Sequence, residues 1–372
     1  MKALKIGNLC ASVPIVQGGM GVGISLSGLA SAVADQGGIG VISSAGLGVI
    51  YNDYSKDYRE ASVWGLKQEL RKAREATRGI VGVNVMVAMS NFADMVRTAV
   101  AERADIIFSG AGLPLNLPSF LTEGAKTKLA PIVSSARAAK LLCQKWFAEY
   151  KYIPDAIVVE GPKAGGHLGY KEEQLVDEHY ALESIVPEIV AEVHAFEAEH
   201  GCHIPVIAGG GIYTGEDIYR IMSLGAEGVQ VGTRFLTVEE CCIADTYKER
   251  VLKAKDSDTV VTGRGSGHPV RGLKNKWARA MRKLECDAAA NPDELEGMYA
   301  GSLRRAVEGD VDGGSMMAGQ SAALVHERKT AAQAIADLLA DAEVRGGMNL
   351  QQLAYANAQR TGRAARAVEG KE

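Results

Sequence analysis

The chain has 372 residues, of which 47% are hydrophobic, and its formal net charge at pH 7 is −4. This length exceeds a minimal domain and suits one large α/β barrel with additions. The mildly acidic balance argues against a nucleic acid or an acidic membrane as the main partner.

Eight short apolar runs recur along the chain. They are almost continuously apolar, as strands buried on both faces of a parallel sheet are. The runs are Pro14–Gly18, Ile39–Ser43, Ile80–Val87, Asp105–Ser109, Ala130–Ser134, Ala156–Glu160, Pro205–Ala208 and Gly228–Val231. Eight strands alternating with helices predict an α/β fold, a closed (β/α)8 or TIM barrel, rather than an open doubly wound sheet.

Amphipathic segments separate these runs. They are Leu26–Asp35, Ser62–Thr77, Ala93–Arg103, Ala136–Tyr150, Leu182–His200 and Gly215–Leu224. Thr214 and Asp217 predict where the last helix begins, because a threonine N-cap and a carboxylate three residues later satisfy its first N–H groups.

The pattern changes after the eighth strand. We expect the barrel over residues 1–240, a small helical domain inserted over residues 241–305, and a return to the barrel over residues 306–345. That return ends in a closing helix, Ala331–Ala342. The tail, residues 346–372, is rich in Ala, Gln and Arg. Because barrels with an additional C-terminal tail are commonly dimers, we expect a homodimer.

The stretch Glu160–Gly169 carries the strongest functional signal. A buried strand ends in the carboxylate of Glu160, and a glycine-rich turn then leads to His167. Glycines let a backbone approach a ligand closely, and histidine exchanges a proton near neutral pH. The stretch therefore predicts a cofactor pocket with an acid/base residue at its mouth.

Glycines at the last two strands predict a phosphate site. In TIM barrels the loops after strands seven and eight often bind phosphate through backbone N–H groups. Here they contain Gly209–Gly211 and Gly232-Thr233. FMN, which has a phosphate and a planar ring, fits such a site. PLP fits less well, because no lysine stands at the end of a strand to form its Schiff base. The Gly-x-Gly pieces lack full dinucleotide spacing, so NAD(P)H would dock on the open flavin face.

Other candidate residues carry weaker signals. His194, His200 and His203 lie on or after a helix without evident carboxylate partners, so we expect surface positions. His268 lies in a polar glycine-rich stretch where it could touch substrate. The six cysteines have no zinc-site spacing, so we expect free thiols and no metal. No signal peptide or membrane span is evident, and we expect a cytoplasmic protein.

Several motifs resemble those of the nitronate monooxygenase (2-nitropropane dioxygenase) superfamily, whose members are FMN-dependent barrels. They are Gln17–Met20, Gly82–Asn84, Ser109–Gly112, Ala164–Gly169, Ala208–Ile212 and Gln230–Phe235. Two later pieces, Gly267–Asn275 and Gly309–Gln320, look like the flavin-dependent enoyl-acyl-carrier-protein reductases of bacterial fatty-acid synthesis.

The resemblance implies that His167 is catalytic and that the segment after strand eight lies on the substrate side. Together with the glycine loops it implies cofactor contacts at twelve positions. These are Gly18, Gly19, Met20, Asn84, Glu160, Gly165, Gly166, Gly209, Gly210, Gly211, Gly232 and Thr233.

The sequence leaves three functions open. The first is NAD(P)H-dependent reduction of the C=C bond of a 2-enoyl thioester, with an acyl carrier protein as a candidate partner. Arg271, Lys274 and Lys276 would suit its anionic phosphopantetheine arm. The second is oxidation of alkyl nitronates with O2, which needs no nicotinamide. The third is a flavin-free barrel that serves as a binding scaffold.

Overall fold

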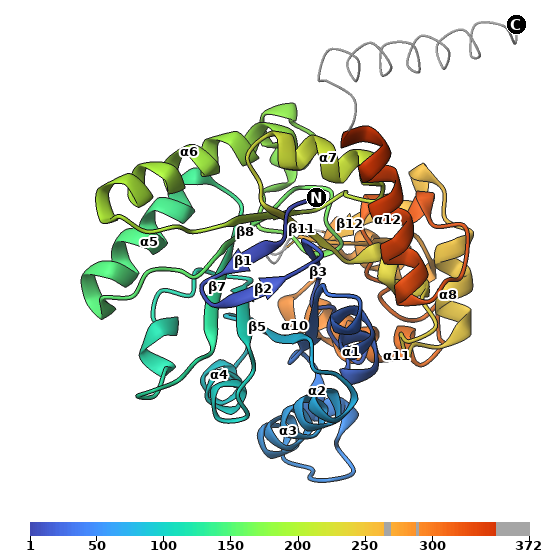
Figure 1. Ribbon diagram of the computed structural model, residues 1–372. Helices are drawn as coiled ribbons and strands as arrows, with labels where there is room; N and C mark the ends of the chain where they lie inside the picture. The colour runs from blue at the N-terminus through green and yellow to red at the C-terminus, as the bar shows by residue number, and fades with distance from the viewer. Residues whose placement is uncertain (264–268, 288–289, 347–372) are drawn as a thin grey trace, which may run out of the picture.

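The computed structural model describes residues 1–263, 269–287 and 290–346 (Figure 1). Eight parallel strands close into a barrel in the order β10-β11-β3-β4-β5-β6-β7-β8, and helices surround it. The predicted TIM barrel is thus confirmed. His268 and the tail beyond residue 346 lie outside the described residues.

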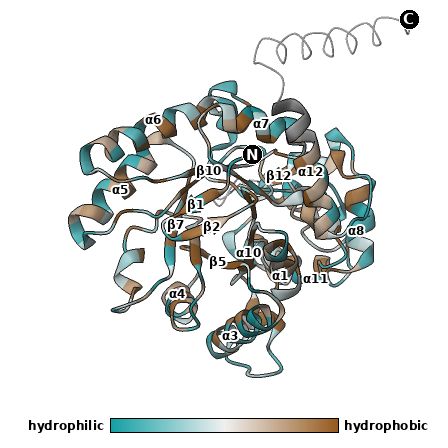
Figure 2. Ribbon diagram, viewed as in Figure 1, coloured by the Kyte–Doolittle hydropathy of each residue, from teal (hydrophilic) through white to brown (hydrophobic). Residues whose placement is uncertain are grey.

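All eight predicted strands are present, and every predicted end lies within two residues of the observed one. They are β3 (Ile15–Gln17), β4 (Ile39–Ser43), β5 (Ile80–Met86), β6 (Ile106–Gly110), β7 (Lys128–Val133), β8 (Ile157–Glu160), β10 (Val206–Gly209) and β11 (Gly228–Val231). Most of their residues are buried, because helices cover the outside and side chains fill the inside. Figure 2 shows the same contrast between hydrophobic strands and helices with hydrophilic outer faces.

Six helices correspond to the six amphipathic segments. They are α1 (Ser27–Asp35), α3 (Tyr58–Ala76), α4 (Phe92–Ala101), α5 (Ala136–Tyr150), α6 (Leu182–His200) and α7 (Gly215–Ser223). A short additional helix, α2 (Leu47–Ile50), precedes α3. The closing helix α12 (Ala331–Gly346) packs against α7 and α1. It therefore fills the gap in the outer layer of helices between the last and the first unit of the barrel.

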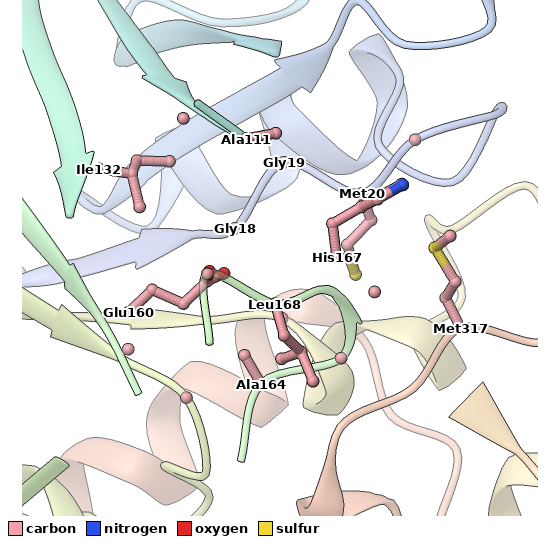
Figure 3. Close-up of a pocket in the computed structure, with 18 of the residues that line it drawn as sticks. Gly18, Gly19, Met20, Ala111, Ile132, Glu160, Ala164, His167, Leu168 and Met317 are labelled. Atoms are coloured by element: carbon pink, nitrogen blue, oxygen red, sulfur yellow. The ribbon is translucent and has the colours of Figure 1, made fainter. Parts of the chain in front are cut away.

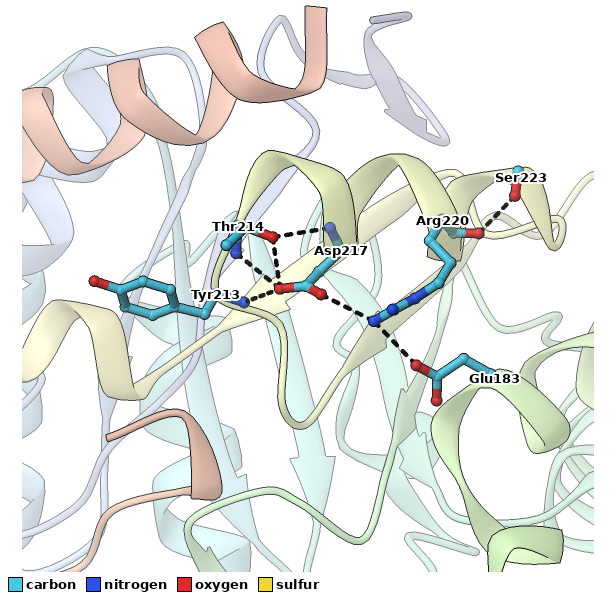
Figure 4. Close-up of polar contacts among 6 residues, drawn as sticks. All are labelled: Glu183, Tyr213, Thr214, Asp217, Arg220 and Ser223. Carbon is cyan, nitrogen blue, oxygen red and sulfur yellow. Dashed lines mark hydrogen bonds and ion pairs between the residues drawn. The ribbon is translucent and has the colours of Figure 1, made fainter. Parts of the chain in front are cut away.

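The start of α7 confirms the predicted cap (Figure 4). Asp217 Oδ2 accepts hydrogen bonds from the N–H groups of Thr214 (2.8 Å) and Tyr213 (3.0 Å). Thr214 Oγ1 in turn accepts from the Asp217 N–H at 3.1 Å. Arg220 bridges Asp217 at 2.9 Å and Glu183 at 3.0 Å, which ties α7 to α6 just beyond the loop after β10.

An N-terminal hairpin, absent from the sequence-based expectation, covers the amino end of the barrel. It consists of β1 (Leu4–Ile6) and β2 (Leu9–Ala11). Leu4, Ile6 and Ala11 are buried in the cluster that fills the barrel interior. Each strand has three residues, too few for periodicity to register. With this end covered, ligands approach from the carboxyl ends of the strands.

The segment after β11 is mostly helical but also contributes a sheet. Its helices are α8 (Asp245–Leu252), α9 (Lys276–Glu285), α10 (Pro292–Tyr299) and α11 (Ser302–Val307). Two strands, β12 (Thr259–Thr262) and β13 (Val270–Leu273), pair antiparallel, and β13 also pairs with β9 (Gly166–His167). The expected helices are thus accompanied by a strand pair that the sequence analysis did not predict, although the β-branched run at β12 favours a strand.

Short 3-10 helices fill the remaining connections. They are η1 (Leu117–Phe120), η2 (Glu172–Leu175), η3 (Glu178–Tyr180), η4 (Thr233–Thr237), η5 (Asp256–Asp258) and η6 (Gln320–Leu324). All six cysteines carry free thiols. In the described part of the chain, no helix combines the length and apolar character that crossing a membrane requires.

Candidate active site

The carboxyl ends of the barrel strands surround a cavity of about 1100 Å³ (Figure 3). This volume is at the upper end of the range for small-molecule and cofactor sites. The structure brings all thirteen predicted site residues to its wall: Gly18, Gly19, Met20, Asn84, Glu160, Gly165, Gly166, His167, Gly209, Gly210, Gly211, Gly232 and Thr233. They lie on or after five different barrel strands, so closure of the barrel brings them together.

A buried glutamine shapes the loop after β3. Gln17 is fully buried; its Nε2 donates to Ser25 Oγ at 2.8 Å, and its Oε1 accepts from the Val41 N–H at 3.0 Å. Ser25 Oγ also accepts from the Met20 N–H at 2.9 Å. Satisfied buried polar groups of this kind fix a backbone in one conformation. Gly18, Gly19 and Met20 thus form a rigid part of the cavity wall.

The side chain of Asn84 packs directly against bare backbone. A Cβ at Gly19 would stand 2.2 Å from Asn84 Cβ, far closer than two non-bonded carbon atoms can approach. Asn84 Nδ2 donates to the Phe108 carbonyl at 3.4 Å, which turns its amide along the wall toward the next strand. Only glycine at position 19 leaves room for this arrangement.

The loops after β10 and β11 form a glycine-lined end of the cavity. Gly210 and Gly211 have φ angles of +105° and +98°, which strongly favour glycine. The Gly319 N–H donates to Thr233 Oγ1 at 2.9 Å, so the C-terminal segment closes over this end. Backbone N–H groups and a hydroxyl here suit a phosphate, as the sequence predicts.

Glu160 ends β8 and points into the cavity (Figure 3). Burial raises the pKa of its carboxyl to about 7, because the charged form loses hydration there. Tyr170 Oη donates to the Glu160 backbone carbonyl at 2.5 Å, which holds the strand end in place. At neutral pH this carboxyl is therefore available both as a proton donor and as an acceptor.

The three-stranded sheet holds His167 at the cavity. In that sheet His167 stands opposite Val270 and Gly166 opposite Arg271, and the Leu168 N–H donates to the Pro269 carbonyl at 2.9 Å. The His167 side chain remains exposed and lines the cavity. A residue in a paired strand is positioned more firmly than one in a free loop, which suits an acid/base group.

Sequence reasoning missed several wall residues. Lys163 and Tyr170 line the cavity from the loop after β8, and Met317 lines it from the C-terminal segment. Met317 Sδ lies 3.3 Å from where a Cβ of Gly166 would stand, and the Met317 carbonyl accepts from buried Tyr247 Oη at 2.8 Å. Met317 belongs to the sequence motif Gly309–Gln320, but only the folded chain shows that this segment lies beside His167.

Two expectations about other side chains were wrong. Arg271 is buried: it donates to the Pro162 carbonyl at 2.9 Å and to Gln320 Oε1 at 3.2 Å, so it is not a surface cation for a carrier. His203 does have carboxylate partners, Glu197 at 2.9 Å and Glu227 at 3.2 Å, although it remains an exposed residue.

Comparison with known proteins agrees with this geometry. The family model described as "Nitronate monooxygenase" matches residues 2–341. A curated protein of Staphylococcus aureus strain JH9, named "Probable nitronate monooxygenase", is 28% identical over 337 residues, which cover 84% of this chain and 90% of that protein.

Solved structures with a similar fold include two enzymes of the kinds considered above. FabK from Thermotoga maritima, an enoyl-acyl-carrier-protein reductase, is 32% identical with a TM-score of 0.72, over 90% of this chain and 96% of that one. A nitroalkane oxidase from Streptomyces ansochromogenes shares the fold at 22% identity and a TM-score of 0.70, over 91% of this chain and 98% of that one.

Proposed function

Since this chain belongs to the nitronate monooxygenase family and is a flavin-dependent oxidoreductase, we propose that it uses FMN and NAD(P)H to reduce the C=C bond of 2-enoyl thioesters. One observation carries the proposal. The two segments that resemble enoyl reductases both lie against the histidine strand: Val270 in β13 pairs with His167, and Met317 Sδ lies 3.3 Å from where a Cβ of Gly166 would stand. The likeness to FabK supports the same activity.

The cavity residues fit FMN. Gly210 and Gly211, whose φ angles favour glycine, bring bare backbone to the cavity wall beside the Thr233 hydroxyl, where it would hold a phosphate. Gly18 and Gly19 line the same cavity and present no side chain to it, so a ring system could approach their backbone closely. When bound, FMN would supply hydride transfer, which no amino-acid side chain provides.

The protein's own groups would handle the proton and the substrate. His167 would donate a proton to the α-carbon of the thioester, or stabilise the negative charge that develops on its carbonyl oxygen. Apolar wall residues, among them Leu113, Leu303 and Val307, would hold the acyl chain and exclude water. An acyl carrier protein is the proposed donor of the substrate.

Oxidation of alkyl nitronates is the second candidate. The name of the curated Staphylococcus aureus relative favours it. In that reaction His167 would position the anionic nitronate or act as base toward a nitroalkane. The same cavity would serve either reaction, so the reductant and the substrate distinguish them.

Anaerobic mixing with NADH and with NADPH tests the proposal. Rapid bleaching of the bound flavin, followed by reoxidation with crotonyl or longer enoyl thioesters on coenzyme A or on a carrier protein, is the expected result. An unbleached flavin together with turnover of propyl nitronate in air would replace the reductase with the second candidate. A protein that stays colourless after addition of FMN would contradict both.

A further inference from the structure

The loop that carries Lys163 is fixed from two sides. Buried Arg271 donates to the Pro162 carbonyl at 2.9 Å, and the Gln320 N–H donates to the Lys163 carbonyl at 3.0 Å. A Cβ at Gly165 would stand 2.4 Å from the Gly319 nitrogen, so the two segments touch. The backbone at position 163 is therefore held in place without help from its own side chain.

The side chain of Lys163 leaves this loop toward the glycine-lined end of the cavity. Its Cβ and Cδ lie 3.0 and 3.2 Å from where a Cβ of Gly211 would stand. A Cβ at Gly319 would stand 3.0 Å from both the Lys163 carbonyl oxygen and Thr233 Oγ1. Lys163 is thus next to both loops that offer N–H and hydroxyl groups to a phosphate.

The ammonium group of Lys163 has no ion pair or hydrogen bond to any described residue. Among the described residues that line the cavity, Lys163 and Lys171 are the two lysines, and no arginine is present. Lys171 lies at the start of η2, beside the exposed Glu172 and Glu173. Lys163 therefore brings an uncompensated positive charge to an end of the cavity whose other donors are neutral.

We propose that Lys163 binds the phosphate of the flavin cofactor and makes the site selective for FMN over riboflavin. The inference rests on the proposed use of FMN. A dianionic phosphate gains most from a donor that also carries charge, and lysine serves this role as a mobile point charge. Neutral N–H groups of Gly210 and Gly211 orient the phosphate, and Lys163 supplies the neutralising charge.

Binding of two flavins tests this assignment without reference to turnover. Riboflavin has the same ring as FMN but no phosphate. Affinities for both are measured by flavin fluorescence quenching, at low and at high salt, for the wild type, Lys163→Met, Lys163→Arg and Lys171→Met. Methionine keeps an apolar stem against Gly211 while removing the charge.

Lys163→Met is expected to weaken FMN binding roughly ten- to hundredfold and to flatten its salt dependence, with riboflavin affinity unchanged. Lys163→Arg should keep most of the preference, and Lys171→Met should keep all of it. Equal weakening of both flavins in Lys163→Met, or unaltered FMN affinity, would overturn the assignment.

The proposed function fails in a different way. A wild-type protein that binds neither flavin would overturn the use of FMN and this inference with it. A protein that binds FMN through Lys163 yet reduces no enoyl thioester would remove the proposed substrate while supporting the role of Lys163.

Discussion

Replacing Glu160 with glutamine should change how the stability of the flavin-free protein depends on pH. Burial raises the pKa of this carboxyl from its ordinary 4.5 to about 7 in the folded chain. Between these two pH values the folded state holds a proton that the unfolded state has lost. The stabilisation from that proton is fully present below about pH 4.5 and is lost as pH rises through about 7.

The size of the effect follows from the difference in pKa. At about 1.4 kcal/mol for each tenfold change in proton affinity, it amounts to about 3 kcal/mol. Glu160→Gln removes the ionisable group but keeps a similar shape. The free energy of unfolding of the variant, relative to wild type, should therefore rise by about 3 kcal/mol between pH 4.5 and pH 8.

Urea unfolding of flavin-free protein at several pH values measures this directly. Glu173→Gln, at an exposed site on the same cavity, controls for the loss of one carboxylate and should follow the wild-type pH profile. A constant offset between Glu160→Gln and wild type across this pH range would refute the argument, because it would mean that Glu160 does not change its proton binding on folding.

Three further predictions concern the site and its support. His167→Ala should retain the flavin spectrum while steady-state turnover falls about 10²–10⁴-fold; full activity would remove His167 from the mechanism. Gly210→Ala should destabilise the fold by about 2 kcal/mol or more and weaken flavin binding, because φ is +105° and the new Cβ would stand 2.7 Å from the Gly161 carbonyl oxygen; thermal melts and flavin titration check this. Asp217→Ala should cost about 1–2 kcal/mol through loss of the α7 cap, whereas Glu183→Ala should cost less than about 1 kcal/mol; equal losses in urea unfolding would contradict the cap argument.

Much of the barrel was predictable because its signals are local. A parallel strand covered on both faces must be apolar along its length, so Ile39–Ser43 and Gly228–Val231 were both predicted with the ends that the structure gives them. The cap at Thr214 and Asp217 is likewise a short-range pattern. The glycines at the ends of several strands predicted parts of the cavity wall, since barrels of this kind open their sites at those ends.

Other features depend on contacts between distant parts of the chain. The strand at His167 exists because residues 270 and 271 pair with it, more than 100 positions away, and nothing near His167 in the sequence signals a partner. The sequence led us to expect Arg271 at the surface as a cation, but in the folded chain it is buried and donates a hydrogen bond to the Pro162 carbonyl. Lys163 lies beside Gly211, at the glycine-lined end of the cavity, only because the loops after β8 and β10 meet in the folded chain.

Local patterns in the sequence were enough to predict the barrel and most of the residues around its open end, because burial, turn geometry and helix capping act over a few residues. Only the folded chain shows how the segment after β11 returns to the cavity and which charged side chains line it. That outcome depends on strand pairing and side-chain packing between segments far apart in the chain, which local pattern does not encode.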